Sequence, residues 1–453
     1  MAQVLARERL GTDPVGKLMF RMAVPSVIAM LMQALYNTVD SAFAARVSSS
    51  GLVAVTLAFP IQLIAGAMST GIGVGINSSI SRGLGEGNET RSGRAAANGM
   101  VIGLISVLLM VLFGLFGSGW FIRLYSAEQE VVKTGITYVR TISLLSFGNI
   151  FTQISFSILQ GSGSMIIPLV CHTAGAVSLF IFDWLFTSVL HMGILGIALG
   201  SSCAQIVSMG IGLYGVFVRN RKNLPISGRD FRPDGAVIKD ILSVGIPSAL
   251  TQATTSVVSG ILNVIITRYG IAAVSVYGGY SKFSTFGILP VFGVTRGMNP
   301  VLGFSYGAKN RERFLKARRI AGTAALIITS MIGLVVLTMP RLVLGLFNAT
   351  PEMTEIGVRA YRIMSLTLFI NGISIVLSQS FPPAKRSYLT MIYTIARQVG
   401  LLVPLCLLLP RFWGMTGVWI GYAMTDYLAF FIVLVMDLIF RKKVLGAWKE
   451  EGK

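Results

Sequence analysis

The chain has 453 residues, of which 53% are hydrophobic and only 12% are charged. That balance excludes a soluble globular domain and is typical of an α-helical protein that crosses a membrane many times. The formal net charge of +20 could indicate a nucleic-acid partner. However, the basic residues lie in short loops between apolar runs and not on one amphipathic face. We therefore expect a lipid bilayer around the protein and no nucleic acid.

Twelve apolar runs follow one another along the chain. Each is long enough, at about 1.5 Å per residue, to cross a hydrocarbon core about 30 Å thick. The runs cover roughly residues 18–45, 52–80, 95–118, 133–160, 165–190, 194–218, 238–266, 271–301, 319–339, 356–380, 387–410 and 414–440. They predict an all-α integral membrane protein with twelve transmembrane helices.

Lysine and arginine residues predict the orientation of these helices. If the N-terminus lies in the cytoplasm, most of the 38 basic residues fall in cytoplasmic segments, including residues 219–239, 309–319 and 441–453. The outer segments then hold few basic residues. By the positive-inside rule, both termini are expected in the cytoplasm.

The chain repeats itself at an offset of 222 residues. The matches include Val24-Pro25-Ser26 with Ile246-Pro247-Ser248, Gly75-Ile76-Asn77 with Gly297-Met298-Asn299, and Asn149 with Asn371. Each repeat holds six apolar runs, an even number, so both repeats enter the membrane from the same side as parallel repeats. We expect an N-lobe of residues 1–218, a cytoplasmic linker of residues 219–238 and a C-lobe of residues 239–453. A substrate site is expected where the two lobes meet.

One face of the first apolar run is polar. Gln33, Tyr36, Asn37 and Asp40 have the spacing i, i+3, i+4 and i+7, which places them on one side of a helix. A carboxylate at membrane depth costs roughly 3 kcal/mol or more, so it is rarely kept without a use. We interpret this face as the wall of a wet cavity; the alternative is a buried carboxyl that serves only helix packing.

Two further polar stripes have a helical spacing of i, i+4, i+7 and i+11. The first comprises Asn149, Gln153, Phe156 and Gln160, and the second comprises Gln252, Ser256, Ser259 and Asn263. Such residues can be hydrogen-bonding contacts between membrane helices. Three turns with several amides fit a wetted wall better, so both stripes are predicted to face the cavity.

Other charged residues inside the apolar runs are few. Asp183 and Lys282 are central and stand beside Asp40 as site candidates, and Asp426 is a weaker candidate. Their alternative role is mutual pairing for structure. Lys282 is also a candidate counter-charge to the acid.

Three more charges lie in the later runs. Asp437 is expected to be solvated or paired with Arg441 at i+4. Arg296 lies near the end of a run, from which a long side chain can reach the interface. Arg397 has no evident partner in the sequence.

The sequence gives no sign of catalysis. His172 and His191 stand alone, the three cysteines lie far apart within apolar runs, and no nucleophile is spaced suitably from a base. We therefore predict a protein that is not an enzyme and has no metal site and no cofactor.

The chain resembles the bacterial multidrug and toxic compound extrusion family, in the branch of the DNA-damage-inducible type exporters and their Gram-positive multidrug relatives. The matching segments are Ala23-Val24-Pro25, Leu35-Tyr36-Asn37-Thr38-Val39-Asp40, Gly73-Val74-Gly75, Ser81-Arg82-Gly83-Leu84-Gly85, Asp183, Gly193-Ile194-Leu195-Gly196-Ile197-Ala198 and Gly414-Met415-Thr416-Gly417-Val418. The resemblance covers essentially the whole chain. It implies a V-shaped pair of lobes in the bacterial plasma membrane that exports organic cations in exchange for protons or sodium ions.

The resemblance also implies roles for individual residues. Asp40 is implicated in ion coupling, with Tyr36 and Asp183 nearby, and the bend of the first helix falls near Pro25. Ser201 fills a hydroxyl position expected at the start of the sixth helix. Relatives that bind sodium tend to carry Asn four residues before the fifth-helix acid, where this chain has Leu179. That loss favours protons over sodium ions as the coupling ion.

The resulting prediction is a monomeric, proton-coupled exporter of small amphipathic or cationic organic compounds. The residues expected to line its substrate cavity are Gln33, Asn37, Asn149, Gln153, Phe156, Gln252, Ser256, Asn263, Lys282 and Asn371. The alternatives are a sodium-coupled antiporter, a flippase for a lipid-linked precursor and a membrane scaffold without transport. A flippase usually holds phosphates with several Arg or Lys residues, and Lys282 is nearly alone at depth.

Overall fold

The computed structural model describes residues 6–47, 49–124, 128–347 and 349–446. These residues form helices joined by turns and short loops, without a strand. The first half contains α1 (Ala6–Thr12), α2 (Val15–Val47), α3 (Ser49–Gly85), α4 (Glu89–Leu112), η1 (Phe113–Gly117), α5 (Ser118–Arg123), α6 (Gln129–Leu144), α7 (Ser146–Gly161), α8 (Ile166–Asp183), η2 (Trp184–Val189), α9 (Gly193–Tyr214) and η3 (Gly215–Arg219). The second half contains η4 (Gly228–Phe231), α10 (Gly235–Thr267), α11 (Ile271–Gly307), α12 (Arg311–Thr338), α13 (Pro340–Gly345), α14 (Pro351–Ser365), α15 (Leu368–Gln379), η5 (Pro382–Ala384), α16 (Ser387–Ile395), η6 (Ala396–Leu402), α17 (Val403–Leu408), α18 (Pro410–Phe440) and η7 (Arg441–Leu445).

Among the described residues, nine helical segments are long and apolar enough to cross a membrane, and two bent helix pairs raise the number to eleven. The bent pairs are α6 with α7, at 42°, and α14 with α15, at 47°. They fall at equivalent places in the two repeats, where the sequence predicts single runs. The predicted run at 271–301 corresponds to α11, a helix of 37 residues that is not among these eleven. The all-helical membrane fold is therefore confirmed, and the count of twelve spans stays a prediction.

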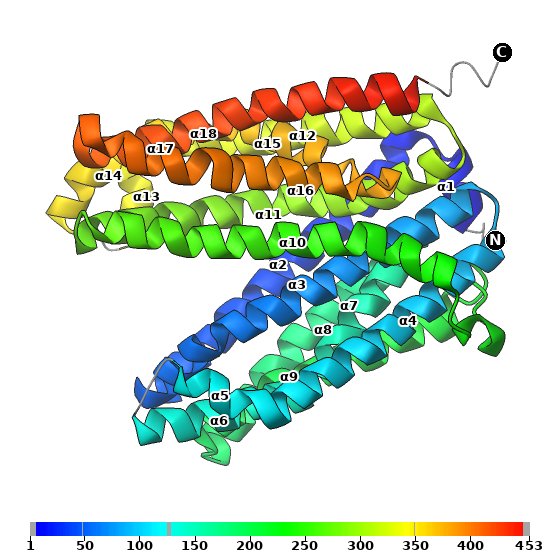
Figure 1. The fold of residues 1–453 in the computed structure, drawn as a ribbon, viewed down its shortest axis with the longest axis horizontal. Helices are drawn as coiled ribbons and strands as arrows, with labels where there is room; N and C mark the ends of the chain where they lie inside the picture. Colours follow the sequence, from blue (N-terminus) through cyan, green and yellow to red (C-terminus); the bar gives the residue numbers. More distant parts are fainter. Residues whose placement is uncertain (1–5, 48, 125–127, 348, 447–453) are drawn as a thin grey trace.

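The helices gather into two bundles (Figure 1). One bundle contains α2–α9 and the other contains α10–α18; the bundles meet near the end that carries α1 and the end of α18, and diverge toward the opposite end. Across the junction α3 packs along α10, α2 packs along α11, and α3 also contacts α11. Because α2 and α3 occupy the same places in the first repeat as α10 and α11 in the second, the junction uses the same pair of helices twice.

The junction is close because small residues face one another. On α3, Gly71 lies against the backbone of Gly245, and Gly75 lies against the carbonyl oxygen of Ile241. On α11, Gly297 lies against the backbone of Ala23 in α2. Small residues let membrane helices approach at backbone distance, so they fix where the two bundles touch.

Replacing Gly75 by Ala should loosen this junction. A Cβ at Gly75 would overlap the Ile241 carbonyl oxygen, which belongs to the other bundle. We expect a loss of about 1–3 kcal/mol of stability from the added methyl group, measured as a lower midpoint of thermal unfolding in detergent. Gly66→Ala is the matched control, because it lies on the same helix with no atom within 4 Å of an added Cβ. Equal midpoints for the two variants would contradict the close contact.

Two buried acids of the second bundle, Asp426 and Asp437, form ion pairs with arginines. Arg397, in η6, donates from Nη2 to Asp426 Oδ1 at 2.6 Å and from Nε to the same oxygen at 2.9 Å. The partner that the sequence did not reveal for Arg397 is therefore Asp426, one helix away. Asp437 pairs with Arg441 at 2.8 Å, as the i+4 spacing predicted, and also with Arg318. Asp437 is not solvated, because its side chain is only 3% exposed.

Candidate functional site

A carboxyl cluster lies in the first bundle, where α2 meets α9. The Ser201 hydroxyl donates a hydrogen bond of 2.5 Å to Asp40 Oδ1. The Tyr36 hydroxyl, one turn before Asp40 on α2, donates to the backbone oxygen of Ser201 at 3.2 Å. The structure thus brings together three residues that the sequence analysis placed in the ion site, and two of them, Asp40 and Ser201, are 161 positions apart in the chain.

Asp183 adds a second acid to this cluster. It is the last residue of α8, directly before the π-helical segment η2, and its side chain is fully buried. It interacts electrostatically with both Asp40 and Tyr36. Neither carboxylate oxygen has a hydrogen-bond partner within the described part of the chain. The carboxylate packs on Gly200 of α9, where an added Cβ would overlap Oδ1.

Two residues near the acids were missed by the sequence analysis. Gln62 of α3 donates from Nε2 to the Tyr138 hydroxyl of α6 at 2.9 Å. Tyr138 is buried and lies within electrostatic range of Asp40 and Asp183. Both are polar groups inside apolar runs, which was the available signal, but neither belongs to a polar stripe.

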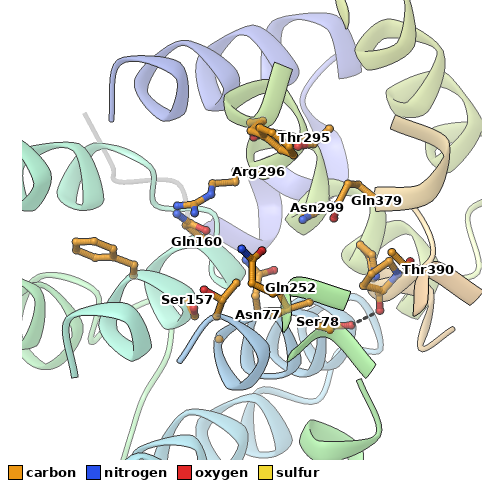
Figure 2. Close-up of a pocket in the computed structure, with 18 of the residues that line it drawn as sticks. Asn77, Ser78, Ser157, Gln160, Gln252, Thr295, Arg296, Asn299, Gln379 and Thr390 are labelled. Carbon is orange, nitrogen blue, oxygen red and sulfur yellow. Dashed lines mark hydrogen bonds between the residues drawn. The ribbon is translucent and has the colours of Figure 1, made fainter. Parts of the chain in front are cut away.

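A polar cavity of about 200 Å³ lies between the bundles. It is lined by α3, α7, α10, α11, α15, α16 and the turn at η5 (Figure 2). Its lining residues are Thr70, Gly73, Val74, Asn77, Ser78, Gln153, Phe156, Ser157, Gln160, Ser248, Thr251, Gln252, Phe292, Thr295, Arg296, Asn299, Gln379, Pro382, Pro383 and Thr390. Asn77 and Asn299, which are equivalent in the two repeats, both line it.

Part of the predicted cavity wall lies in this cavity. Gln153, Phe156 and Gln252 line it, together with Gln160 of the first stripe. The remaining predicted cavity residues are outside its wall: Gln33 and Asn37 on α2, Asn149 on α7, Ser256 and Asn263 on α10, Lys282 on α11 and Asn371 on α15. Three of the four residues of the first stripe and one of the four residues of the second therefore line the cavity.

Two cations lie differently from the expectation. Arg296 extends from α11 into the cavity in the direction of Gln160 (Figure 2), so it does not reach outward to the membrane interface. Lys282, on the same helix, is exposed and forms no ion pair with any acid in the described ranges. Its proposed role as counter-charge to Asp40 therefore has no contact to support it.

An ionic cluster joins the two bundles beside the cavity, and it is buried except for the half-exposed Lys385. Asp240 of α10 accepts from Arg82 Nη2 of α3 at 2.7 Å, and both side chains are at most 4% exposed. Lys385 Nζ lies 2.8 Å from its other oxygen, and the Ser79 hydroxyl donates to Oδ2 at 2.9 Å. Next to it the Ser78 hydroxyl donates to the Pro382 carbonyl at 2.7 Å. We call Arg82, Asp240, Lys385 and Ser79 the junction cluster.

Two repeated helical bundles, a polar cavity between them and a cluster of two carboxyls within one of them define a multi-pass membrane protein built like a secondary transporter. A family model described as MatE matches residues 25–185 and 247–408, which is more than half of the chain. The second match begins 222 residues after the first, at 247 against 25. The chain therefore belongs to the MatE family.

Known relatives cover nearly the full length. The "Multidrug export protein MepA" of Staphylococcus haemolyticus (strain JCSC1435) is 23% identical over 424 residues, covering 92% of this chain and 93% of that protein. Its namesake from Staphylococcus aureus (strain MSSA476) is 22% identical, with 90% of each chain covered. A solved structure described as the outward-facing conformation of a multidrug resistance MATE family transporter superposes with a TM-score of 0.91, at 25% identity over 98% of both chains.

Proposed function

We propose that the protein is a multidrug exporter of the bacterial plasma membrane that exchanges small amphipathic, mostly cationic compounds for protons. Relatives that match nearly its whole length are multidrug export proteins. In this proposal twelve helices cross the membrane, with α11 as the twelfth span, and both termini lie in the cytoplasm. The activity is transport and not catalysis.

The observation that carries the proposal is the carboxyl cluster. Asp40 is held by a single hydroxyl from Ser201, and Asp183 is fully buried without a hydrogen-bond donor among the described residues. A carboxylate without an ion-pair partner inside a membrane span is costly, so each acid needs a proton or a cation to neutralise it. Exchange of that neutralising charge for a cationic cargo couples the inward flux of protons to the outward flux of cargo.

The cycle follows from the charge balance. With the cavity open to the cytoplasm, ionised Asp40 attracts the cationic part of the cargo. After the bundles rock to face outward, a proton from outside removes that negative charge and weakens binding, so the cargo leaves. The membrane potential contributes about 2.3 kcal/mol for each net charge moved across 100 mV.

Protons are favoured over sodium ions by the surroundings of Asp183. Leu179, one turn before it on α8, is fully buried and offers no oxygen ligand. A hard cation such as sodium requires several oxygen ligands, as the hard divalent cations do. The sodium-coupled alternative uses the oxygens of Asp40, Asp183, Tyr36 and Ser201, which lie within one cluster.

The coupling ion is tested by dye efflux from cells that express the protein. We expect efflux to stop when a protonophore collapses the proton gradient and to continue when sodium is replaced by choline. Cells that carry an empty vector are the control for other exporters. Efflux that stops on sodium removal and persists without a proton gradient would replace the proton with sodium in this proposal.

A further inference from the structure

We infer that the interlobe cavity binds an anionic group of the cargo, a carboxylate or a phosphate, through Arg296. This inference rests on the proposed function in taking the ligand to be transported cargo. It refines the substrate class: among the amphipathic cationic compounds of the proposed function, those that also carry a negatively charged end bind most tightly.

The charge of the cavity carries the argument. Arg296 is the only charged residue among those that line it; the others are amides, hydroxyls, glycine and apolar groups. Arg296 forms no ion pair with any acid that the structure describes. The nearby Asp240 is already held by Arg82, Lys385 and Ser79 in the junction cluster.

The positive charge of Arg296 is also absent from the equivalent position of the first repeat. The residue 222 positions before Arg296 is Val74, which lines the same cavity from α3. Asn77 and Asn299 occupy equivalent positions in the two repeats, whereas the charged residue of the cavity comes from the second repeat alone. An unpaired arginine inside a membrane span is costly, and helix packing alone does not offset that cost. A ligand that supplies the counter-charge would offset the cost.

The neighbouring groups suit an anion. Amides of Gln160, Gln252 and Gln379 and several hydroxyls around the cavity can donate hydrogen bonds to it. A guanidinium matches the two oxygens of a carboxylate or phosphate. Phe156 and Phe292 add apolar wall, against which the remainder of an amphipathic molecule packs.

The size of the cavity indicates which part of the cargo it takes. At about 200 Å³ it is smaller than the roughly 300–1,000 Å³ of sites that enclose a drug-sized molecule. It therefore fits the charged end of such a molecule and not the whole of it.

Binding to purified protein in detergent tests this inference without any ion gradient. The probes are a zwitterionic xanthene dye with a free carboxylate and the methyl ester of the same dye, which is a pure cation. We expect the wild type to bind the acid more tightly than the ester. Arg296→Gln should weaken binding of the acid by about tenfold or more, as expected for loss of a charged hydrogen-bonding partner, and should leave the ester within about twofold.

Two matched variants complete the test. Arg296→Lys keeps the charge and should retain part of the preference, and Arg341→Gln removes an exposed arginine of α13 and should change neither affinity. A competition experiment tests whether a lipid phosphate occupies the same site. Short-chain phosphatidic acid is the competitor, and short-chain phosphatidylcholine is its control. Displacement of the acid dye by phosphatidic acid in the wild type and in Arg296→Lys, but not in Arg296→Gln, supports the anion site.

Equal affinity of wild type for acid and ester, or equal losses for both dyes in Arg296→Gln, overturns the inference. A failure of proton coupling with these affinities intact would refute the proposed function and leave the anion site standing.

Discussion

Asp40→Asn is expected to reduce export to the background of membranes without the protein. The substitution keeps the size of the side chain and its hydrogen bond to the Ser201 hydroxyl, so the fold should survive. It removes the carboxyl group that α2 contributes to the cluster, which in the proposed cycle alternates between a charged and a neutral form. Transport of a fluorescent cation in inside-out vesicles, energised by respiration, measures the loss.

The control for this variant lies on the same helix. Thr38 is exposed, and its hydroxyl bonds to the backbone of Ala34, so Thr38→Val should transport at the wild-type rate. The midpoint of thermal unfolding, measured for both variants, distinguishes a loss of ion coupling from a loss of folding. Wild-type rates for Asp40→Asn across a range of external pH values would assign Asp40 to packing alone.

Asp240→Asn is expected to open the junction between the bundles. It leaves Arg82 buried without its carboxylate and Lys385 without its nearest acid. Removing one partner of a buried ion pair costs about 3–5 kcal/mol. Separation of the bundles at this end relieves the cost by hydrating Arg82, whose side chain is only 3% exposed in the closed junction. Hydrogen–deuterium exchange should therefore rise in residues 78–88 and 232–245.

Glu86→Gln provides the matched control for that experiment. Glu86 pairs with Arg91 at 2.6 Å nearby, but both side chains are about one-third exposed, and exposed pairs contribute only about 0–1 kcal/mol. Arg91 also lies 3.5 Å from Asp240, and Glu86→Gln leaves that ion pair in place. Its exchange should match the wild type. If Asp240→Asn is too unstable to purify, Lys385→Gln should show a smaller rise in exchange. Unchanged hydrogen–deuterium exchange in both Asp240→Asn and Lys385→Gln would mean that the junction cluster does not hold the bundles together.

The fold could largely be predicted because its signals are local. Apolar runs and the repeat offset depend only on neighbouring residues and spacing, and they predicted the all-helical membrane architecture. The bends between α6 and α7 and between α14 and α15 were not predicted, because the apolar runs continue across them. The 37-residue α11 was predicted as a span, but it carries Lys282 and Arg296 and is less apolar than its neighbours.

The site could be predicted only in part because it depends on contacts between distant segments. The position of Asp40 within an apolar run marked it directly, and the family resemblance added Ser201. The Arg82–Asp240 pair joins residues 158 positions apart, and the Arg397–Asp426 pair joins two helices of one bundle. Neither contact has a local sequence signal, since each residue alone resembles any charge near a membrane.

Proton movement during transport is the most direct test of the central claim, the exchange of a proton on Asp40 for cargo. Purified protein is reconstituted into sodium-free liposomes with a pH-sensitive dye inside, and a cationic substrate is added outside. The account predicts a change of internal pH that follows substrate uptake in wild type and is absent in Asp40→Asn. Substrate uptake with no change of internal pH, or an identical pH change in Asp40→Asn, would contradict it.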